Sequence, residues 1–161
     1  MKAFMDKEFM LQSPTAQHLY HDYAADMPIC DYHCHIPPRE IYENRRFENI
    51  AQVWLGGRNP DGSYFGDHYK WRVMRSNGVP EEYITGDKPD RERFQKFAEA
   101  LPMAIGNPMY HWTNLELHVF FGYDGVLNGD TAEEVWNLCN DKLQHDPKLT
   151  VRGLIEQSNV A

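Results

Sequence analysis

Apolar positions along the chain recur mainly at helical spacing. Apolar residues three and four positions apart predict amphipathic helices over residues 14–25, 90–101, 108–121 and 131–144. Start and stop signals around shorter segments predict further helical pieces over residues 38–44, 49–55, 67–77, 80–83 and 150–157. This pattern predicts a predominantly α-helical chain.

Several of these helices carry N-terminal signals. Ser13-Pro14 and Asn107-Pro108 each place a capping side chain before a proline at the first helical position. Thr131 followed by Glu134 predicts a capping box, in which the two side chains bond reciprocally to the backbone of the first turn. Thr150 is the expected cap of the last helix.

One short apolar run departs from helical spacing. Pro28 and the Pro37-Pro38 pair bound a run that contains Ile29, Cys30, Tyr32 and Cys34, which predicts a buried strand of about six residues with both thiols in the core. A buried strand needs hydrogen-bonding partners for its backbone. We expect these partners either from the N-terminal arm at residues 4–11 or from chain not present in this sequence.

The end of this run carries His33 and His35. Alternate side chains of a strand point to the same face, so the two imidazoles are expected to project together and Cys34 to point away. Two neighbouring imidazoles supply half of a first-row metal site, which a carboxylate and water would complete. The alternative is a pair of histidines at a strand exit, one exposed and one hydrogen-bonded, because His-x-His also arises by chance.

A second candidate region follows the turn-forming residues 56–63. Gly66 leads into Asp67-His68-Tyr69, where Asp67 is expected to cap a helix that ends before Gly78. Long loops often carry binding sites, and the positive end of a helix favours an anionic ligand. The alternative is that Asp67 is only a cap and that Tyr69 packs against its neighbours.

Composition narrows the classes of function. A formal net charge of −8 argues against a nucleic-acid-binding surface, because phosphate recognition needs a basic patch. Three cysteines without paired spacing indicate a reducing compartment. No signal peptide and no membrane span are predicted, so a cytoplasmic location is expected. The remaining helical histidines, His18, His21, His111 and His118, are expected to be solvated or structural.

Several longer segments resemble the uronate isomerase (glucuronate isomerase) family of the amidohydrolase superfamily. The segments that carry the resemblance are Asp31 to His35, Phe47 to Ile50, Gly66 to Arg72, Tyr83 to Gly86 and Gly106 to Trp112. The Gly-Asp-His-Tyr-Lys-Trp-Arg and Gly-Asn-Pro-x-Tyr-His-Trp stretches are much longer than chance motifs. The chain is similar to the N-terminal third of a family member.

The resemblance implies a specific fold and chemistry. Members are (β/α)₈ TIM barrels that interconvert D-glucuronate with D-fructuronate and D-galacturonate with D-tagaturonate. The family's metal-binding His-x-His falls on His33 and His35, and its substrate-binding and catalytic His-Tyr pair falls on His68 and Tyr69. The implied cofactor is a divalent metal, with zinc expected, and the implied partners are a small uronate sugar and a second copy of the chain in a homo-oligomer, without nucleic acid or membrane.

The same resemblance implies the organisation of the chain. Residues 1–37 would form an N-terminal arm, a helix and the first barrel strand, 38–157 a helical insertion subdomain, and 158–161 the start of the connection to the second strand. A barrel of this class needs about 250 residues, so a fragment is expected to be inactive alone and to bind zinc weakly. The alternatives are a metal-dependent hydrolase of the same superfamily and a non-catalytic helical module.

Overall fold

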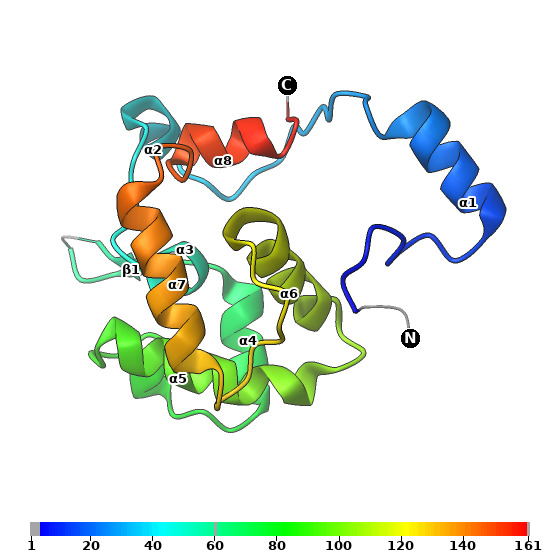
Figure 1. Ribbon diagram of the computed structural model, residues 1–161. Helices are drawn as coiled ribbons and strands as arrows, with labels where there is room; N and C mark the ends of the chain where they lie inside the picture. The colour runs from blue at the N-terminus through cyan, green and yellow to red at the C-terminus, as the bar shows by residue number, and fades with distance from the viewer. Residues whose placement is uncertain (1–3, 60, 161) are drawn as a thin grey trace.

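The computed structural model describes residues 4–59 and 61–160. In these residues the chain forms eight α-helices, three short helical turns and one two-stranded sheet (Figure 1). The α-helices are α1 Pro14–Leu19, α2 Pro38–Glu43, α3 Ile50–Leu55, α4 His68–Ser76, α5 Asp90–Ala100, α6 Pro108–Phe121, α7 Ala132–His145 and α8 Val151–Gln157. The other elements are the π-helical turn η1 Tyr20–Ala24, the 3₁₀ turns η2 Glu81–Tyr83 and η3 Leu101–Ala104, and strands β1 Gly57–Arg58 and β2 Tyr64–Phe65.

The predicted helical content is therefore confirmed, and several boundaries agree closely. α6 has the predicted bounds, because Asn107 accepts a hydrogen bond from Met109 N at its start and Gly122 adopts φ +62° at its end. α4 begins after Asp67 as predicted, and Gly78 has the expected positive φ of +74° beyond its C-terminus.

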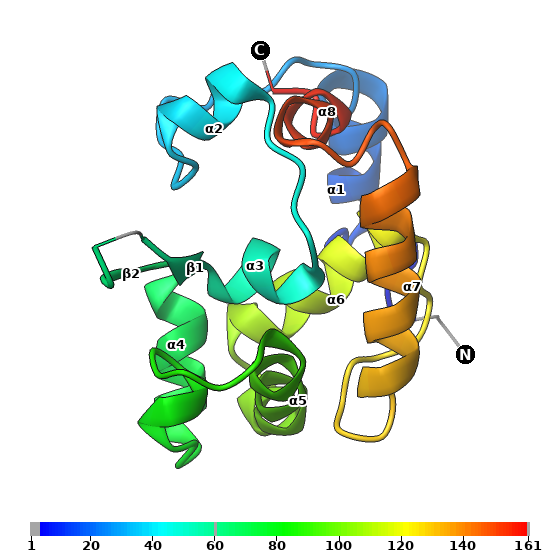
Figure 2. The ribbon, with the colours of Figure 1, turned by 90° about the vertical axis from the view of Figure 1, so that its left-hand side faces the viewer.

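One hydrophobic core joins α3 to α8. Short α3 lies centrally, with α4, α5 and α7 packed around it (Figure 2). The largest side chains that solvent cannot reach are Phe94, Phe97, Ile50, Leu55, Met74, Ile84, Leu101, Leu117, Leu127, Leu143, Leu149 and Val135. Burying side chains of this size stabilises each by about 1.5–3 kcal/mol relative to exposure, so this core holds the helical region together.

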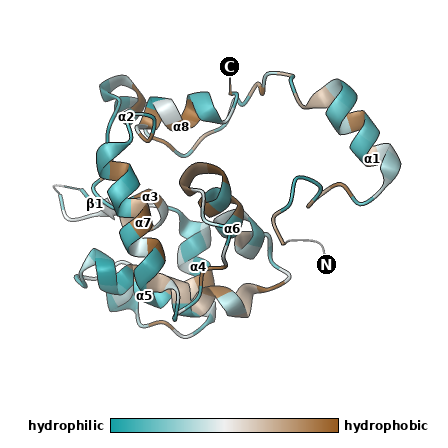
Figure 3. Cartoon of the chain, viewed as in Figure 1, coloured by the Kyte–Doolittle hydropathy of each residue, from teal (hydrophilic) through white to brown (hydrophobic). Residues whose placement is uncertain are grey.

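The N-terminal segment lies outside this core. The predicted helix over 14–25 forms as α1 followed by the π-helical turn η1, and neither contains a buried residue. Figure 1 shows α1 standing apart from the helical body, and Figure 3 shows it largely in the hydrophilic colour. The arm before it does not pair as a strand; it turns so that Phe4 lies 5.6 Å from the ring of Tyr110 on α6.

The predicted buried strand is wrong. In residues 28–35 the structure has a single bridge, between Ile29 and Val160, which are paired in parallel, and all eight residues are exposed. Without further neighbouring strands in the described chain, the backbone has no ladder to join and its side chains have no layer to pack against. The expected core positions of Cys30 and Cys34 are accordingly wrong as well.

Two smaller corrections concern local hydrogen bonding. Residues 56–63 were expected to be loop only, but they include β1 of a small antiparallel hairpin in which Gly57 pairs with Phe65. The capping box at Thr131 does not form: no side-chain cap bond is present, because the Thr131 hydroxyl instead accepts from Asn128 N and donates to Val126 O. The loop before α7 therefore uses the hydroxyl that the helix was expected to use.

The third cysteine, Cys139, is buried. Cys139 lies on α7 with no exposed surface, and burial raises the pKa of its thiol to about 12. Among the residues that the structure describes, no helix is long and apolar enough to cross a membrane.

Candidate functional site

His33 and His35 lie in the exposed segment between η1 and α2. The backbone N–H of His33 donates to the Asp31 carboxylate over 2.9 Å, which fixes a local turn. The Nε2 atoms of the two imidazoles are 3.0 Å apart. The two side chains thus converge on one side of the chain, as the alternation of the sequence predicts, although the strand itself is absent.

His68 and Tyr69 occupy the first turn of α4. Asp67 precedes them in an extended conformation, and its Oδ1 accepts a hydrogen bond from Tyr69 N over 2.8 Å. This cap satisfies one of the free N–H groups of the helix start and fixes where the next two side chains emerge. The rings of His68 and Tyr69 lie 4.2 Å apart.

The structure brings both pairs together. The rings of His35 and His68 stack with centroids 5.8 Å apart and planes at 22°. Three imidazoles and one phenol therefore form a continuous cluster from two segments that are distant in sequence. We call His33, His35, His68 and Tyr69 the four-residue cluster.

Packing between α3 and α4 holds the second half of this cluster in place. Trp71 donates its indole N–H to Leu55 O over 3.0 Å. A side chain at Gly66 would stand 2.4 Å from the same carbonyl, and one at Gly56, whose φ is +70°, would stand 1.9 Å from Phe65 O. Only glycine permits these close approaches, so the hairpin fixes the position of α4 relative to the cluster.

A small cavity of about 290 Å³ lies beside the cluster. It extends between the segment after His35 and the first turn of α4. Its lining residues are His35, Ile36, Pro37, Glu40, Phe47, Gln52, Val53, Gly56, Phe65, Gly66, Asp67, Tyr69 and Lys70. This mixture of apolar walls with a few polar groups is typical of small-molecule sites.

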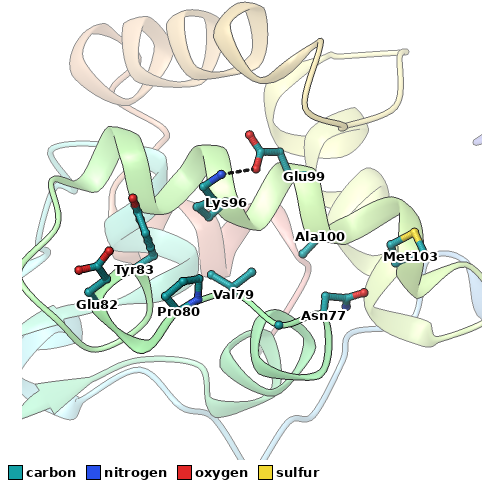
Figure 4. A pocket seen from close by; sticks show the side chains of 10 residues that line it. Asn77, Val79, Pro80, Glu82, Tyr83, Lys96, Glu99, Ala100 and Met103 are labelled. Atoms are coloured by element: carbon teal, nitrogen blue, oxygen red, sulfur yellow. Dashed lines mark hydrogen bonds and ion pairs between the residues drawn. The ribbon is translucent and has the colours of Figure 1, made fainter.

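Of the other pockets, one of about 670 Å³ also reaches the cluster, because Tyr69 and its neighbour Arg72 line it. Figure 4 shows a pocket of about 580 Å³ beyond the C-terminal end of α4, where Lys96 and Glu99 form an ion pair. None of the four cluster residues lines it.

The remaining helical histidines are paired or packed. His18 and His21 are exposed, as expected, but each has an acidic partner that the sequence did not indicate. His118 bonds to Asp124, His18 to Asp22 and His21 to Glu8, while His111 packs against Phe9. Within residues 4–59 and 61–160, no group of three or more His, Cys, Asp or Glu side chains is arranged to hold a metal ion. This includes the three imidazoles of the four-residue cluster, which is the place where the site residues predicted from the sequence meet.

Two neighbours of the cluster were missed in the sequence. Lys70 is buried and pairs with Asp67, and the guanidinium of Arg72 lies 5.7 Å from the centroid of the Tyr69 ring. The available signal was spacing, because residues three positions apart on a helix are neighbours. Both pairs, Asp67 with Lys70 and Tyr69 with Arg72, have that spacing.

Comparisons with known proteins identify relatives over the whole chain. The glucuronate isomerase family model matches residues 1–161. The uronate isomerase of Lachnospira eligens is 70% identical over 160 residues, and that of Lachnoclostridium phytofermentans is 59% identical. Each alignment covers 99% of this chain and 32% of the relative, so the chain spans about a third of the length of these relatives.

Solved structures agree with this result. The crystal structure of uronate isomerase from Thermotoga maritima matches 99% of this chain and 32% of its own, with a TM-score of 0.84 and 33% identity. Glucuronate isomerase from Caulobacter crescentus matches with a TM-score of 0.79 at 23% identity, which shows a shared fold.

Proposed function

The chain belongs to the glucuronate isomerase family, and on that premise we propose that it supplies part of the active site of an aldose–ketose isomerase. The proposed full-length enzyme interconverts D-glucuronate with D-fructuronate and D-galacturonate with D-tagaturonate. The observation that carries the proposal is the four-residue cluster, which joins the His-x-His segment to the start of α4.

The side chains of the cluster suit this reaction. Isomerisation moves a proton between neighbouring carbons and redistributes protons on their oxygens, which needs acid, base and hydrogen-bonding groups. His68 is proposed to bind the substrate carboxylate or a hydroxyl, and Tyr69 to donate a hydrogen bond or relay a proton. Both emerge at the N-terminus of α4, whose partial positive charge favours the anionic substrate.

His33 and His35 fit a divalent metal, and zinc is the proposed ion. Two nitrogen ligands on a tetrahedral ion lie about 3.3 Å apart, given metal–nitrogen distances of about 2.0–2.1 Å. Their observed Nε2 separation of 3.0 Å is close to this value. When bound, a divalent metal polarises substrate oxygens. The further ligands are proposed to come from the two thirds of the family's length outside this chain.

The family also suggests the surrounding architecture. We propose a (β/α)₈ barrel of the amidohydrolase superfamily, with residues 1–37 carrying the first strand, 38–157 the helical insertion and 158–161 the way to the second strand. The parallel bridge between Ile29 and Val160 supports this division, because two neighbouring parallel strands begin with such a pairing. A homo-oligomer in the cytoplasm is proposed as well, the compartment being supported by three free thiols.

An isomerase assay on the full-length protein tests the proposal. Purified enzyme would be given D-glucuronate or D-galacturonate, with and without chelator, alongside His33→Ala. Removing a residue that hydrogen-bonds to a metal ligand typically lowers metal affinity or activity by about 10–100-fold. Removing a ligand itself should therefore lower kcat/KM by more than about 100-fold. His145→Ala is the matched control, because His145 is exposed on α7 and bonds only within that helix.

The outcomes separate the candidate functions. Turnover that is lost with chelator and in His33→Ala, but kept in His145→Ala, supports the isomerase with its metal site. Absence of turnover of either uronate by folded, metal-loaded protein would contradict it and favour a hydrolase or a non-catalytic helical module. The 161-residue chain alone is expected to show no turnover.

A further inference from the structure

Lys70 carries a charge where side chains of its type are rarely found. It lies on α4, two residues after His68, and only 6% of it is exposed. Lysine is almost never fully buried unless it is paired, because removing an ammonium group from water is costly. The contacts that compensate this cost therefore indicate what the residue does.

The Lys70 ammonium has two partners. It donates to Asp67 Oδ2 over 3.1 Å, and it lies 6.0 Å from the centroid of the Trp54 ring. Trp54 is buried in the core and donates its indole N–H to Glu116 on α6 over 2.5 Å. Because Trp54 is fixed in this way, it forms a rigid wall against which the ammonium is held.

Asp67 uses both of its carboxylate oxygens. Oδ1 accepts from Tyr69 N as the cap of α4, while Oδ2 accepts from Lys70. The Asp67 side chain is 30% exposed, so a carboxylate without its cation would be able to turn toward water. The ion pair therefore fixes the rotamer that the cap requires.

The ion pair and two members of the four-residue cluster line the same cavity of about 290 Å³. Lys70, Asp67, His35 and Tyr69 all line it. Any rotation of Asp67 would release Tyr69 N from its cap and loosen the first helical turn. His68 and Tyr69 both lie in that turn, so their directions depend on the cap.

We propose that Lys70 is a positioning residue for His68 and Tyr69. Its ammonium holds the Asp67 carboxylate in the capping position, and the cap fixes the first turn of α4, from which both side chains emerge and in which Tyr69 lines the cavity. The catalytic consequence rests on the proposed isomerase function, whereas the effect on the first turn of α4 does not. A displacement of about 1 Å at a reacting group can cost about 100-fold in rate, so the effect on turnover should be measurable.

The decisive variant is Lys70→Met in the full-length protein. Methionine retains most of the volume of the buried stem and removes only the charge. We expect kcat to fall by about 10- to 100-fold with KM changed by less than about three-fold. Hydrogen exchange at the Tyr69 amide should accelerate by about ten-fold or more, because its acceptor becomes mobile.

Companion variants separate positioning from stability. Met74→Ala is the matched control, since Met74 is buried on the same helix but lies toward its other end. It should lower the melting temperature at least as much as Lys70→Met while kcat per folded molecule stays within about two-fold. Lys96→Met removes another ion pair at i,i+3 spacing, with Glu99 on α5, and should change neither kcat nor Tyr69 exchange.

A double-mutant cycle tests whether Lys70 acts through Asp67. Asp67→Asn keeps an oxygen acceptor for the cap but removes the ion pair. If one pathway connects the two residues, Asp67→Asn with Lys70→Met should reduce kcat no more than the stronger single variant does. Lys70→Arg, which keeps the charge, should recover part of the lost kcat.

Several results would overturn the proposal. These are unchanged Tyr69 exchange in Lys70→Met, an effect confined to KM, a loss of kcat in Met74→Ala equal to that in Lys70→Met, or full additivity in the cycle. The exchange measurement requires no turnover. An inactive wild-type enzyme would therefore contradict the proposed function, while the exchange data would still decide the positioning role.

Discussion

Residues 4–36 contain no buried side chain, whereas residues 38–157 enclose the entire hydrophobic core of the described chain. The first region presents one half of the four-residue cluster, His33 and His35, and the second presents the other half, His68 and Tyr69. The comparison teaches that the two halves are stabilised differently. Packing fixes the helical half, while the His-x-His half is exposed and is held by a local turn, a single bridge, the stacking of His35 on His68 and the partial packing of Ile36 against the core.

The largest difference between the regions should appear in thiol reactivity. In the 161-residue chain at pH 8, Cys30 and Cys34 are expected to react with a thiol reagent at the rate of an exposed cysteine. Cys139 should react at least about a thousand-fold more slowly. Its neutral thiol is exposed only by unfolding, which costs about 5 kcal/mol or more. Mass spectrometry of the labelled peptides measures the three rates. Equal rates would contradict the comparison.

Large-to-small substitutions should separate the regions in stability. Phe94 has no exposed surface and packs between Trp54 and Trp136, so Phe94→Ala should lower the free energy of unfolding by about 3–5 kcal/mol. Tyr32 is 99% exposed, so Tyr32→Ala should change it by less than about 0.5 kcal/mol. Urea unfolding followed by tryptophan fluorescence measures both values, because all four tryptophans lie in residues 38–157.

Matched helix caps provide a smaller test. Asn107 caps α6, which contributes to the core, and Ser13 caps α1, which contains no buried residue. Asn107→Ala should lower the free energy of unfolding by about 1 kcal/mol. Ser13→Ala should leave the urea transition unchanged and reduce only the helical signal in circular dichroism. An equal shift of the transition in both variants would show that α1 is part of the cooperative unit.

The smallest expected effect depends on pH. Hydrogen bonds from the Arg75 guanidinium, and then from the Thr85 hydroxyl, lower the pKa of Glu81 to about 2. A carboxyl whose pKa is lowered in the folded state stabilises the fold above its unfolded pKa of about 4.3, and this contribution is lost as the pH falls toward 2. Glu81→Gln should therefore cost less than about 1 kcal/mol at pH 7, because the pair is partly exposed.

The difference in the free energy of unfolding between the wild type and Glu81→Gln should become smaller between pH 4.5 and pH 3. Urea unfolding at a series of pH values measures this difference. Asp22→Asn is the control in the N-terminal segment, because it removes the ion pair with His18 on a helix outside the core. It should not shift the urea transition at any of these pH values. A deficit of Glu81→Gln that stays constant down to pH 3 would contradict the assignment.

The helical region could be predicted from sequence because its determinants are local. The cap and stop residues of α6 act on neighbours within a few positions, and so does Asp67 at α4. The exposed conformation of residues 28–35 could not be predicted, because their apolar pattern indicates a buried strand and specifies burial only when neighbouring strands are present. At Thr131 a prediction from local sequence is wrong. Its hydroxyl is able to bond either to the first turn of α7 or to Asn128 and Val126, and the sequence pattern does not indicate which is preferred.

In the candidate site, too, local features could be predicted from the sequence and contacts between distant segments could not. Convergence of His33 and His35 follows from alternation along an extended chain, a local property. The stacking of His35 on His68 joins distant segments, and without the family resemblance no spacing in the sequence reveals it. Burial of Lys70 depends on Trp54, which belongs to α3, so its charge looks like an ordinary surface charge until the helices are assembled.

The bridge between Ile29 and Val160 also bears on how such a protein is able to change over evolution. The segment between Ile29 and Val160 therefore begins and ends at neighbouring positions, which lie about 4.8 Å apart when two strands are paired. Insertions whose ends lie this close are tolerated well, because the host backbone keeps its course. On the proposed division of the chain, the helical region would be suited to exchange between relatives as a unit, and grafting it onto another scaffold would require only two neighbouring attachment points.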